Sequence, residues 1–218
     1  MQFASIETVY PTFLKLSQKV STDTRNIIPE SIFFALKGEN FDGNTFVEQA
    51  LKNGATCCVI DSKDAVIEGK TFLVEDVLAF LQKLANHHRK QLQIPFIAVT
   101  GSNGKTTTKE LITAVLSKKF KTLATVGNLN NHIGVPLTLL SVTREHEMVV
   151  VEMGANHVGE IELLSKIAEP DYGIITNIGK AHLEGFGGIE GVIKGKGEMY
   201  DYLRGHGGLI FVHLDNTI

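Results

Sequence analysis

The sequence predicts an α/β protein with two domains, a small mixed α/β domain at the N-terminus followed by a domain built on a parallel sheet. Two observations lead to this prediction. From residue 94 onward, strand-like segments alternate with segments of helical periodicity, which is typical of a parallel sheet covered by helices. Before that point the elements are short and mixed, and Pro95 marks the change. We therefore place the domain boundary between residues 91 and 92.

The first domain is expected to contain three helices and three strands. Apolar periodicity and turn residues predict helices over 6–16, 45–53 and 77–90, and strands over 31–36, 56–61 and 71–74. His87 and His88 are expected on a solvated face of the last helix, without a functional role. Cys57 and Cys58, the only cysteines, are adjacent on a strand and point to opposite faces, so we expect reduced core thiols.

The second domain is expected to carry its functional groups along one edge of its sheet. The same patterns predict strands over 94–100, 122–125, 148–152, 172–176 and 208–212, and helices near 105–117, 159–168 and 190–203. In open parallel sheets, ligands bind beyond the carboxyl ends of the strands. Polar residues that directly follow these strands are therefore the first candidates for a site.

The turn at 101–104 has the composition of a phosphate-binding loop. Its glycines let the backbone curl with the N–H groups inward, Lys105 can reach the outer phosphates of a nucleotide, and the Thr106 hydroxyl can ligate Mg²⁺. The general pattern has a glycine where Val99 stands, so this is a shorter variant of a P-loop, and an ordinary glycine turn is the alternative. The sequence predicts an ATP site formed by Gly101, Ser102, Asn103, Gly104, Lys105, Thr106 and Thr107.

Further polar residues follow other strands of the predicted sheet. Glu152 ends an apolar strand, where it could hold Mg²⁺ or, alternatively, cap a helix. His182 lies just past another strand and is either functional or a hydrogen-bonded structural residue. The loop 127–131 is rich in amides suited to a sugar or amide substrate. Lys194 and Glu198 share one helix face and are expected to form a solvated ion pair.

The composition and charge of the chain limit the kinds of partner that it is expected to bind. The chain has 218 residues with 43% hydrophobic content, a formal net charge of -3 and a sequence pI near 6.2. There is no basic field of the kind that nucleic-acid binders present, so we expect no nucleic-acid partner. No apolar run approaches the ~20 residues that cross a bilayer, so we expect no membrane insertion and a cytoplasmic protein. The oligomeric state is not specified by the sequence.

Several segments, taken together, resemble the Mur ligases. They are Thr100-Gly-Ser-Asn-Gly-Lys-Thr106, Gly127-Asn-Leu-Asn-Asn-His-Ile-Gly-Val-Pro136, Glu152-Met-Gly-Ala-Asn-His-Val-Gly-Glu-Ile161, Ala181-His-Leu-Glu-Gly-Phe-Gly187 and Lys194-Gly-Lys-Gly-Glu198. The shorter phosphate loop is the usual form in this family. In the first domain, the segments 21–25 and 35–43 resemble those that hold the uridine diphosphate sugar. The resemblance therefore implies a substrate site with Ser21, Thr22, Asp23, Arg25, Lys37, Gly38, Asn130 and Asn131.

The resemblance also implies a reaction, that of the members which add D-alanyl-D-alanine to UDP-N-acetylmuramoyl-tripeptide. ATP would activate the peptide carboxylate as an acyl phosphate, and the dipeptide amine would displace phosphate. In this reading the catalytic residues are Lys105, Glu152, His182 and Lys196. Thr106 and Glu152 would hold one Mg²⁺ and His182 the second. Lys196 matches the lysine that carries a metal-binding carbamate in the family, and a plain lysine that stabilises phosphate charge is the alternative.

The match covers essentially the whole chain, but the family is roughly twice this length. We therefore expect a fragment, with a UDP-sugar-binding domain at 1–91, a partial central ATP-binding domain at 92–218, and no C-terminal domain. Such a chain should show no ligase turnover alone. Two alternatives stay open, a sister Mur ligase that adds another amino acid and a non-catalytic UDP-sugar-binding module. A generic P-loop kinase would leave the uridine-type segments before residue 45 unexplained.

Overall fold

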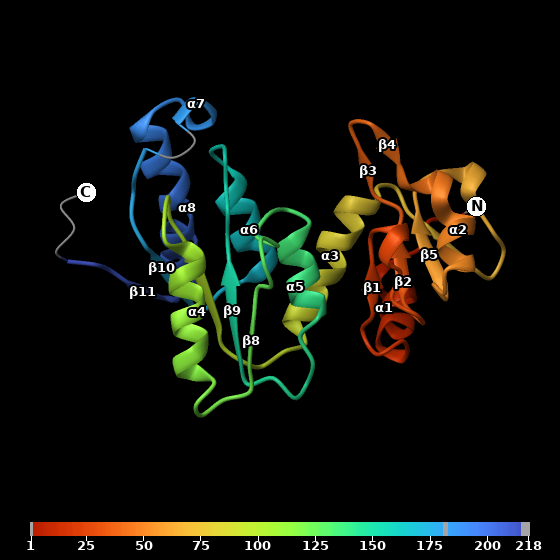
Figure 1. Ribbon diagram of the computed structural model, residues 1–218, viewed down its shortest axis with the longest axis horizontal. Coiled ribbons are helices and arrows are strands. Elements are labelled where there is room, and N and C mark those ends of the chain that lie inside the picture. Colours follow the sequence, from red (N-terminus) through yellow and green to blue (C-terminus); the bar gives the residue numbers. More distant parts are fainter. Residues whose placement is uncertain (1, 181–182, 215–218) are drawn as a thin grey trace. The chain divides into compact units, whose positions relative to one another are not determined.

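The computed structural model describes residues 2–180 and 183–214 and divides into two compact units, Met1–His87 and His88–Ile218 (Figure 1). The division falls inside helix α3 (Val77–Lys90), four residues before the predicted boundary. The last turn of α3 belongs to the second unit because His88 Nε2 contacts the Val142 carbonyl oxygen at 2.8 Å and Arg89 donates to the Ala168 carbonyl at 3.0 Å. His88 is 2% exposed, so the expectation of a solvated position was wrong for this residue.

The first unit is built on a four-stranded parallel sheet in the order β1-β2-β5-β6. Its strands are β1 (Val20–Ser21), β2 (Ile32–Phe34), β5 (Cys57–Ile60) and β6 (Thr71–Leu73), and its further elements are helices α1 (Ile6–Lys15) and α2 (Val47–Lys52) and the hairpin β3 (Lys37–Gly38) and β4 (Phe41–Asp42). The predicted helices and strands of this unit are confirmed. Strand β1 and the hairpin were not predicted, because two-residue strands show no periodicity.

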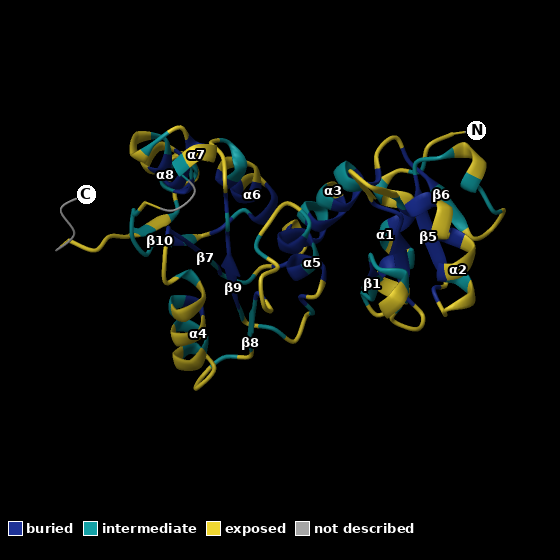
Figure 2. Cartoon of the chain, turned by 45° about the horizontal axis from the view of Figure 1, so that its top comes forward, coloured by how far each residue is buried: buried dark blue, intermediate teal, exposed yellow. Residues whose placement is uncertain are grey.

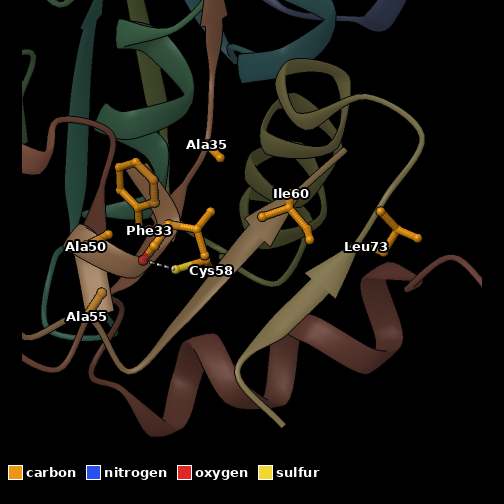
Figure 3. Packing of buried hydrophobic residues seen from close by; sticks show 8 residues of the cluster. Phe33, Ala35, Ala50, Ala55, Cys58, Ile60 and Leu73 are labelled. Atoms are coloured by element: carbon orange, nitrogen blue, oxygen red, sulfur yellow. Dashed lines mark hydrogen bonds between the residues drawn. The ribbon is translucent and has the colours of Figure 1, made fainter. Parts of the chain in front are cut away.

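The core of the first unit follows from the alternation of side chains along its strands. Phe33 and Ala35 from β2 and its end point to the same face as Cys58 and Ile60 from β5, and they pack with residues of α2 (Figure 3). The Cys58 thiol donates to the Val47 carbonyl oxygen at 4.0 Å. Burial raises the pKa of Cys57 to about 11 and that of Cys58 to about 12. Both cysteines are free, buried thiols, as expected.

The second unit is built on a five-stranded parallel sheet in the order β11-β10-β7-β9-β8. The strands are β7 (Phe96–Thr100), β8 (Thr122–Ala124), β9 (Met148–Glu152), β10 (Tyr172–Ile175) and β11 (Leu209–Phe211). Figure 2 shows β7 and β9 as buried. The chain leaves β7 for the edge strand β8, returns through β9, and then crosses to β10 on the other side of β7. The carboxyl ends of β9, β7 and β10 therefore meet where the order reverses, the usual place for a ligand.

Five helices of the second unit lie within its described residues. They are α4 (Lys105–Leu116), α5 (Gly134–Leu140), α6 (Glu160–Ala168), α7 (Leu183–Phe186) and α8 (Ile189–His206). The three predicted helices and five predicted strands are confirmed, whereas α5 and α7 were not predicted. The fold class is α/β in both units. Within residues 2–180 and 183–214, every helix is too short or too polar to cross a membrane.

Candidate active site

The phosphate loop connects β7 to α4 and has the backbone that its glycines predict. Gly101 has φ +142° and Gly104 has φ +77°, both in the region that favours glycine. A Cβ atom at Gly101 would collide with Thr176 Oγ1, whereas one at Gly104 would meet open space. The Lys105 ammonium folds back over the loop and donates to the carbonyl oxygens of Gly101 at 2.9 Å and Ser102 at 3.3 Å. Burial lowers the pKa of Lys105, while the Glu152 charge acts in the opposite direction.

A second loop, at the end of β10, fastens the phosphate loop in place. Thr176 Oγ1 donates to the Asn103 carbonyl oxygen at 2.6 Å, and Asn177 Oδ1 accepts from the Asn103 N–H at 3.0 Å. Ser102 Oγ accepts from the Gly179 N–H at 2.9 Å. A role for these loop residues was not predicted from the sequence. Their signal was their position, because β10 is hydrogen-bonded to β7 and polar residues that end neighbouring parallel strands meet.

Glu152 ends β9 beside the phosphate-loop strand and is 1% exposed. Its Oε1 accepts from the Asn130 side-chain amide at 2.8 Å, so the carboxylate is held by a side chain rather than serving as a helix cap. Its Oε2 has no hydrogen-bond partner among the described residues. Lys109 Nζ lies 4.0 Å from that oxygen. A buried carboxylate oxygen in this state is a ready ligand for a cation.

Lys196 projects from α8 and is 2% exposed. Its ammonium donates to the Ala155 carbonyl oxygen at 3.2 Å and lies 5.1 Å from the centre of the Phe186 ring. Burial and the positive charge of Lys105 lower the pKa of Lys196 to about 8. About a tenth of this side chain is therefore a neutral amine at pH 7, far more than for an ordinary lysine.

Glu198, two residues further along α8, does not form the predicted ion pair with Lys194. Its carboxylate instead accepts from the backbone N–H groups of Gly159 at 2.6 Å and Glu162 at 3.0 Å. These are free donors at the start of α6. Glu198 therefore caps α6 and attaches it to α8, while Lys194 is exposed.

A pocket of about 480 Å³ opens beside Lys105. It is lined by Lys105, Asn128, Asn130, Asn131, His132, Gly154, Ala155, Asn156, Glu160, Leu163 and Leu164. Asn131 is fixed here because its Oδ1 accepts from the N–H groups of Ile133 at 3.1 Å and Gly134 at 2.8 Å. Burial acts to raise the pKa of Glu160, but hydrogen bonds from Asn156 and His157 outweigh it and lower the pKa. The pocket thus places amides and a carboxylate next to the phosphate-loop lysine.

The predicted substrate residues of the first unit contact other residues of that unit, in separate places. The Ser21 hydroxyl is buried and hydrogen-bonds Ser31 Oγ at 3.0 Å, so it serves the packing of the unit. The Asp23 carboxylate accepts from Arg25, which lowers the pKa of Asp23 to about 2, and Thr22 lies beside them, half-buried.

The hairpin carries the other two predicted residues of this unit. Lys37 Nζ forms an ion pair with Asp61 Oδ1 at 2.8 Å, and Gly38 is exposed on the same strand. Lys37 keeps half of its side chain exposed, so its ammonium is accessible to a ligand.

The metal-binding prediction can be compared with the donors present. Thr106 and Thr107 are exposed in the first turn of α4, and the predicted ligand His182 lies outside the described residues. No group of three His, Cys, Asp or Glu side chains that could hold a metal occurs within the described ranges. One buried carboxylate oxygen and one hydroxyl fit Mg²⁺, because this ion takes most of its ligands from water and phosphate. They would not fit a fully protein-bound metal such as structural zinc.

Comparison with known proteins agrees with this geometry. Residues 99–218 match the family model "Mur ligase middle domain", and residues 18–99 match "Mur ligase family, catalytic domain". The UDP-N-acetylmuramoyl-tripeptide--D-alanyl-D-alanine ligase of Bacillus subtilis (strain 168) is 44% identical over 195 residues, which are 88% of this chain and 43% of that protein. The corresponding ligase of Escherichia coli (strain K12) is 43% identical over 198 residues, 91% of this chain and 43% of its own length.

Solved structures give the same result. The MurF ligase of Thermotoga maritima in complex with ADP has a TM-score of 0.78 and 37% identity, and the match covers 86% of this chain and 44% of that one. MurF of Acinetobacter baumannii has a TM-score of 0.79 and 42% identity, over 85% of this chain and 41% of that one. The chain therefore spans less than half the length of the relatives it matches.

Proposed function

The chain belongs to the Mur ligase family, and from this premise we propose that it forms part of an ATP-dependent ligase that adds D-alanyl-D-alanine to UDP-N-acetylmuramoyl-tripeptide in peptidoglycan synthesis. The observation that carries the proposal is the presence of three groups in one unit: a phosphate loop, a buried carboxylate with one oxygen that accepts no hydrogen bond from the described residues, and a desolvated lysine. The names of its 42–44% identical relatives supply the substrates. Because the reaction consumes ATP, we place it in the cytoplasm.

We assign the two parts of the chain different ligands. Residues 1–91 would bind the uridine diphosphate sugar through Asp23, Arg25 and Lys37, whose charged groups are at the surface of the first unit. Residues 92–218 would bind ATP, and the ADP-bound MurF neighbour supports this part. The pocket beside Lys105, with Asn130 and Asn131, would receive the end of the peptide.

The proposed chemistry makes an unreactive carboxylate electrophilic. A carboxylate oxygen of the tripeptide attacks the γ-phosphorus of ATP, and ADP leaves. The amine of the dipeptide then attacks the acyl carbon, phosphate leaves with the bonding electrons, and the amine loses a proton. The first step brings two anions together, and the second builds negative charge on the acyl oxygen and the leaving phosphate, so catalysis depends on positive charge and oriented N–H groups around these atoms.

The residues of this chain would divide that work between binding and orientation. The N–H groups at the start of α4 and the Lys105 ammonium would hold the phosphates, and Lys105 must first leave the carbonyl oxygens it now contacts. Thr106 and Glu152 would hold Mg²⁺, which would supply charge neutralisation at the transferred phosphoryl group. Asn130 would keep the Glu152 carboxylate in its orientation. His182 is assigned to a second Mg²⁺ by resemblance only.

Lys196 is proposed to carry a carbamate. The neutral amine is the form that reacts with CO₂, and the lowered pKa makes that form available. The product would replace a buried cation with a metal-binding anion. A carbonyl signal in ¹³C NMR after exposure to ¹³C-bicarbonate, lost in Lys196→Arg, is the expected result. The same signal in both proteins would leave the plain-lysine alternative.

Calorimetric titration of the 218-residue chain tests the whole proposal. We expect UDP-N-acetylmuramoyl-tripeptide to bind more tightly than UDP-N-acetylglucosamine, which controls for generic uridine binding. A sister ligase would instead prefer a muramoyl ligand with a shorter peptide. Lys105→Ala should abolish ATP binding without affecting the sugar nucleotide. A chain that binds the sugar nucleotide and ignores ATP in both forms would be a non-catalytic binding module.

A further inference from the structure

Lys109 is a second buried lysine near the candidate metal carboxylate, and the proposed function gives it no role. It lies one helical turn after Lys105 on α4, and its side chain is 1% exposed. Its ammonium donates to the Thr125 carbonyl oxygen at 2.7 Å and lies 2.9 Å from Glu110 Oε1 and 4.0 Å from Glu152 Oε2. Burying an ammonium is costly, so its position requires a compensating partner.

Thr125 fixes the geometry of Lys109 and Glu152 together. Its carbonyl oxygen accepts from Lys109, and its hydroxyl oxygen accepts from the Glu152 N–H at 2.9 Å. Thr125 is itself 2% exposed. One buried residue at the end of β8 therefore holds the lysine and the backbone of the carboxylate residue in a fixed relation.

Charge explains why this lysine is there. The Glu152 carboxylate is buried, and among the described residues Lys109 is the cation within ion-pair distance of it. Its other side-chain partner, Asn130, is neutral. Glu110 cannot replace Glu152 as the reason for burial, because the Glu110 side chain is 65% exposed and screened by water.

We propose that Lys109 is a positioning residue that acts as the resident counter-ion of Glu152. It places a positive charge beside the buried carboxylate while no metal is bound and leaves Oε2 without a competing hydrogen bond. A free divalent cation must then approach against the lysine charge, whereas a cation that arrives with nucleotide phosphates brings its own anion. Lys109 would thus favour uptake of Mg²⁺ together with the nucleotide. The metal part of this inference rests on the proposed function, whereas the charge pair does not.

A double-mutant cycle on the full chain tests the pair. Unfolding in urea is measured for Lys109→Met, Glu152→Gln and the double variant. We expect the folding equilibrium constant to fall at least about fivefold more for Lys109→Met when Glu152 is present, the value for unit charges 4 Å apart in water. Glu110→Gln replaces Glu152→Gln in the control cycle and should show weaker coupling than Glu152→Gln, because water screens the exposed Glu110 carboxylate. Additive losses at Lys109 and Glu152 would overturn the proposal.

Binding of Mn²⁺, followed by its electron paramagnetic resonance signal, tests the effect on the metal. We expect Lys109→Met to bind Mn²⁺ about fivefold or more tightly than the wild type, and Lys109→Arg, which keeps the charge, to behave as the wild type. Lys109→Gln, which can still donate to Thr125, serves if the methionine variant does not fold. Equal or weaker binding in the neutral variants would overturn the counter-ion role. If Glu152→Gln leaves Mn²⁺ binding unchanged, the metal assignment of the proposed function fails, while coupling in the urea cycle would still establish the charge pair.

Discussion

The two units treat buried polar groups at the ends of their strands in different ways. In the first unit, the Asn44 side chain donates to Asp42 at 2.7 Å and Asp61 at 2.8 Å and accepts from the N–H groups of Asp61 and Ser62. Lys37 completes this network through its ion pair with Asp61. In the second unit, one oxygen of Glu152 has no hydrogen-bond partner among the described residues, and within the same residues Lys196 donates to one acceptor, the Ala155 carbonyl.

The difference distinguishes polar groups that stabilise the fold from polar groups that could bind a ligand. A satisfied network in a low-dielectric interior stabilises one conformation, whereas an incomplete one costs free energy until something binds. The first unit also contains a buried atom, Gln18 Oε1, that has no hydrogen-bond partner in the part of the chain that the structure describes, but that atom belongs to a neutral amide. The buried carboxylate oxygen without a hydrogen bond from the described residues is in the second unit, at the sheet edge where the phosphate loop lies.

The largest effect is expected from breaking the closed network with Asn44→Leu. This change removes hydrogen bonds at a residue that is 6% exposed and leaves Asp42 and Asp61 without their amide partner. We expect a loss of about 3 kcal/mol in the free energy of unfolding, with ATP binding unchanged. Urea denaturation followed by circular dichroism measures the first and calorimetry the second. A loss below about 1 kcal/mol would show that the network is not what stabilises this unit.

Gly101→Ala tests the phosphate loop, which is hydrogen-bonded to the loop after β10 and follows the strand beside Glu152. The new methyl group would collide with Thr176 Oγ1 and would impose a side chain on a backbone with φ +142°. We expect a loss of about 2 kcal/mol in stability and of measurable ATP binding.

The matched control is Gly104→Ala, which also has positive φ but meets open space. It should cost about 1 kcal/mol, the conformational part alone. Equal losses for both variants would mean that contact with Thr176 is unimportant.

Sequence patterns predicted the framework of both units because it rests on periodicity. They failed where another interaction decides. Helix α5 begins Gly-Val-Pro, which suggests a turn, but Pro136 lies in its first turn, where its missing N–H is not needed.

Within the site, the phosphate loop and Glu152 were predictable, while Lys109 was not. A lysine on an amphipathic helix is expected in water, yet Lys109 is buried and the apolar Leu111 and Val115 of the same helix are 64% and 71% exposed. The reason is the pairing of Lys109 with Thr125 and Glu152, groups 16 and 43 residues away along the chain. No local pattern records such a pairing. Asn177 was not predicted either, because its partner Asn103 also lies far away along the chain.

Lys196→Met should raise the free energy of unfolding, whereas Asn44→Leu should lower it. The pKa of Lys196 is about 8 in the folded protein, lowered from an ordinary value of 10.5. Between these values the unfolded chain binds more protons, so the lysine makes the protein gain stability as pH rises from 8 to 10.5. The methionine variant should therefore be more stable below pH 8, by at most about 3 kcal/mol, and this advantage should vanish above pH 10.5.

The measurement is urea denaturation of both proteins in CO₂-free buffers across this pH range, because a carbamate would change the charge of Lys196. Lys194→Met, at an exposed position of the same helix, is the matched control. A difference between wild type and Lys196→Met that is constant with pH would contradict the desolvation of this amine.

The smallest effect on stability is expected at Glu198. Both of its carboxylate oxygens accept hydrogen bonds, although it lies only two residues from Lys196. Glu198→Gln keeps a side-chain acceptor for the N–H groups of Gly159 and Glu162 but removes the negative charge at the start of α6. We expect a loss of about 1 kcal/mol, from weaker capping and the lost interaction with the helix dipole. Lys194→Ala should change stability by less than about 0.5 kcal/mol, since Lys194 is exposed and Glu198 is engaged with α6. Equal losses in the two variants, with strong coupling between them, would restore the ion pair that the sequence predicted and would remove Glu198 from the residues that hold α6 against α8.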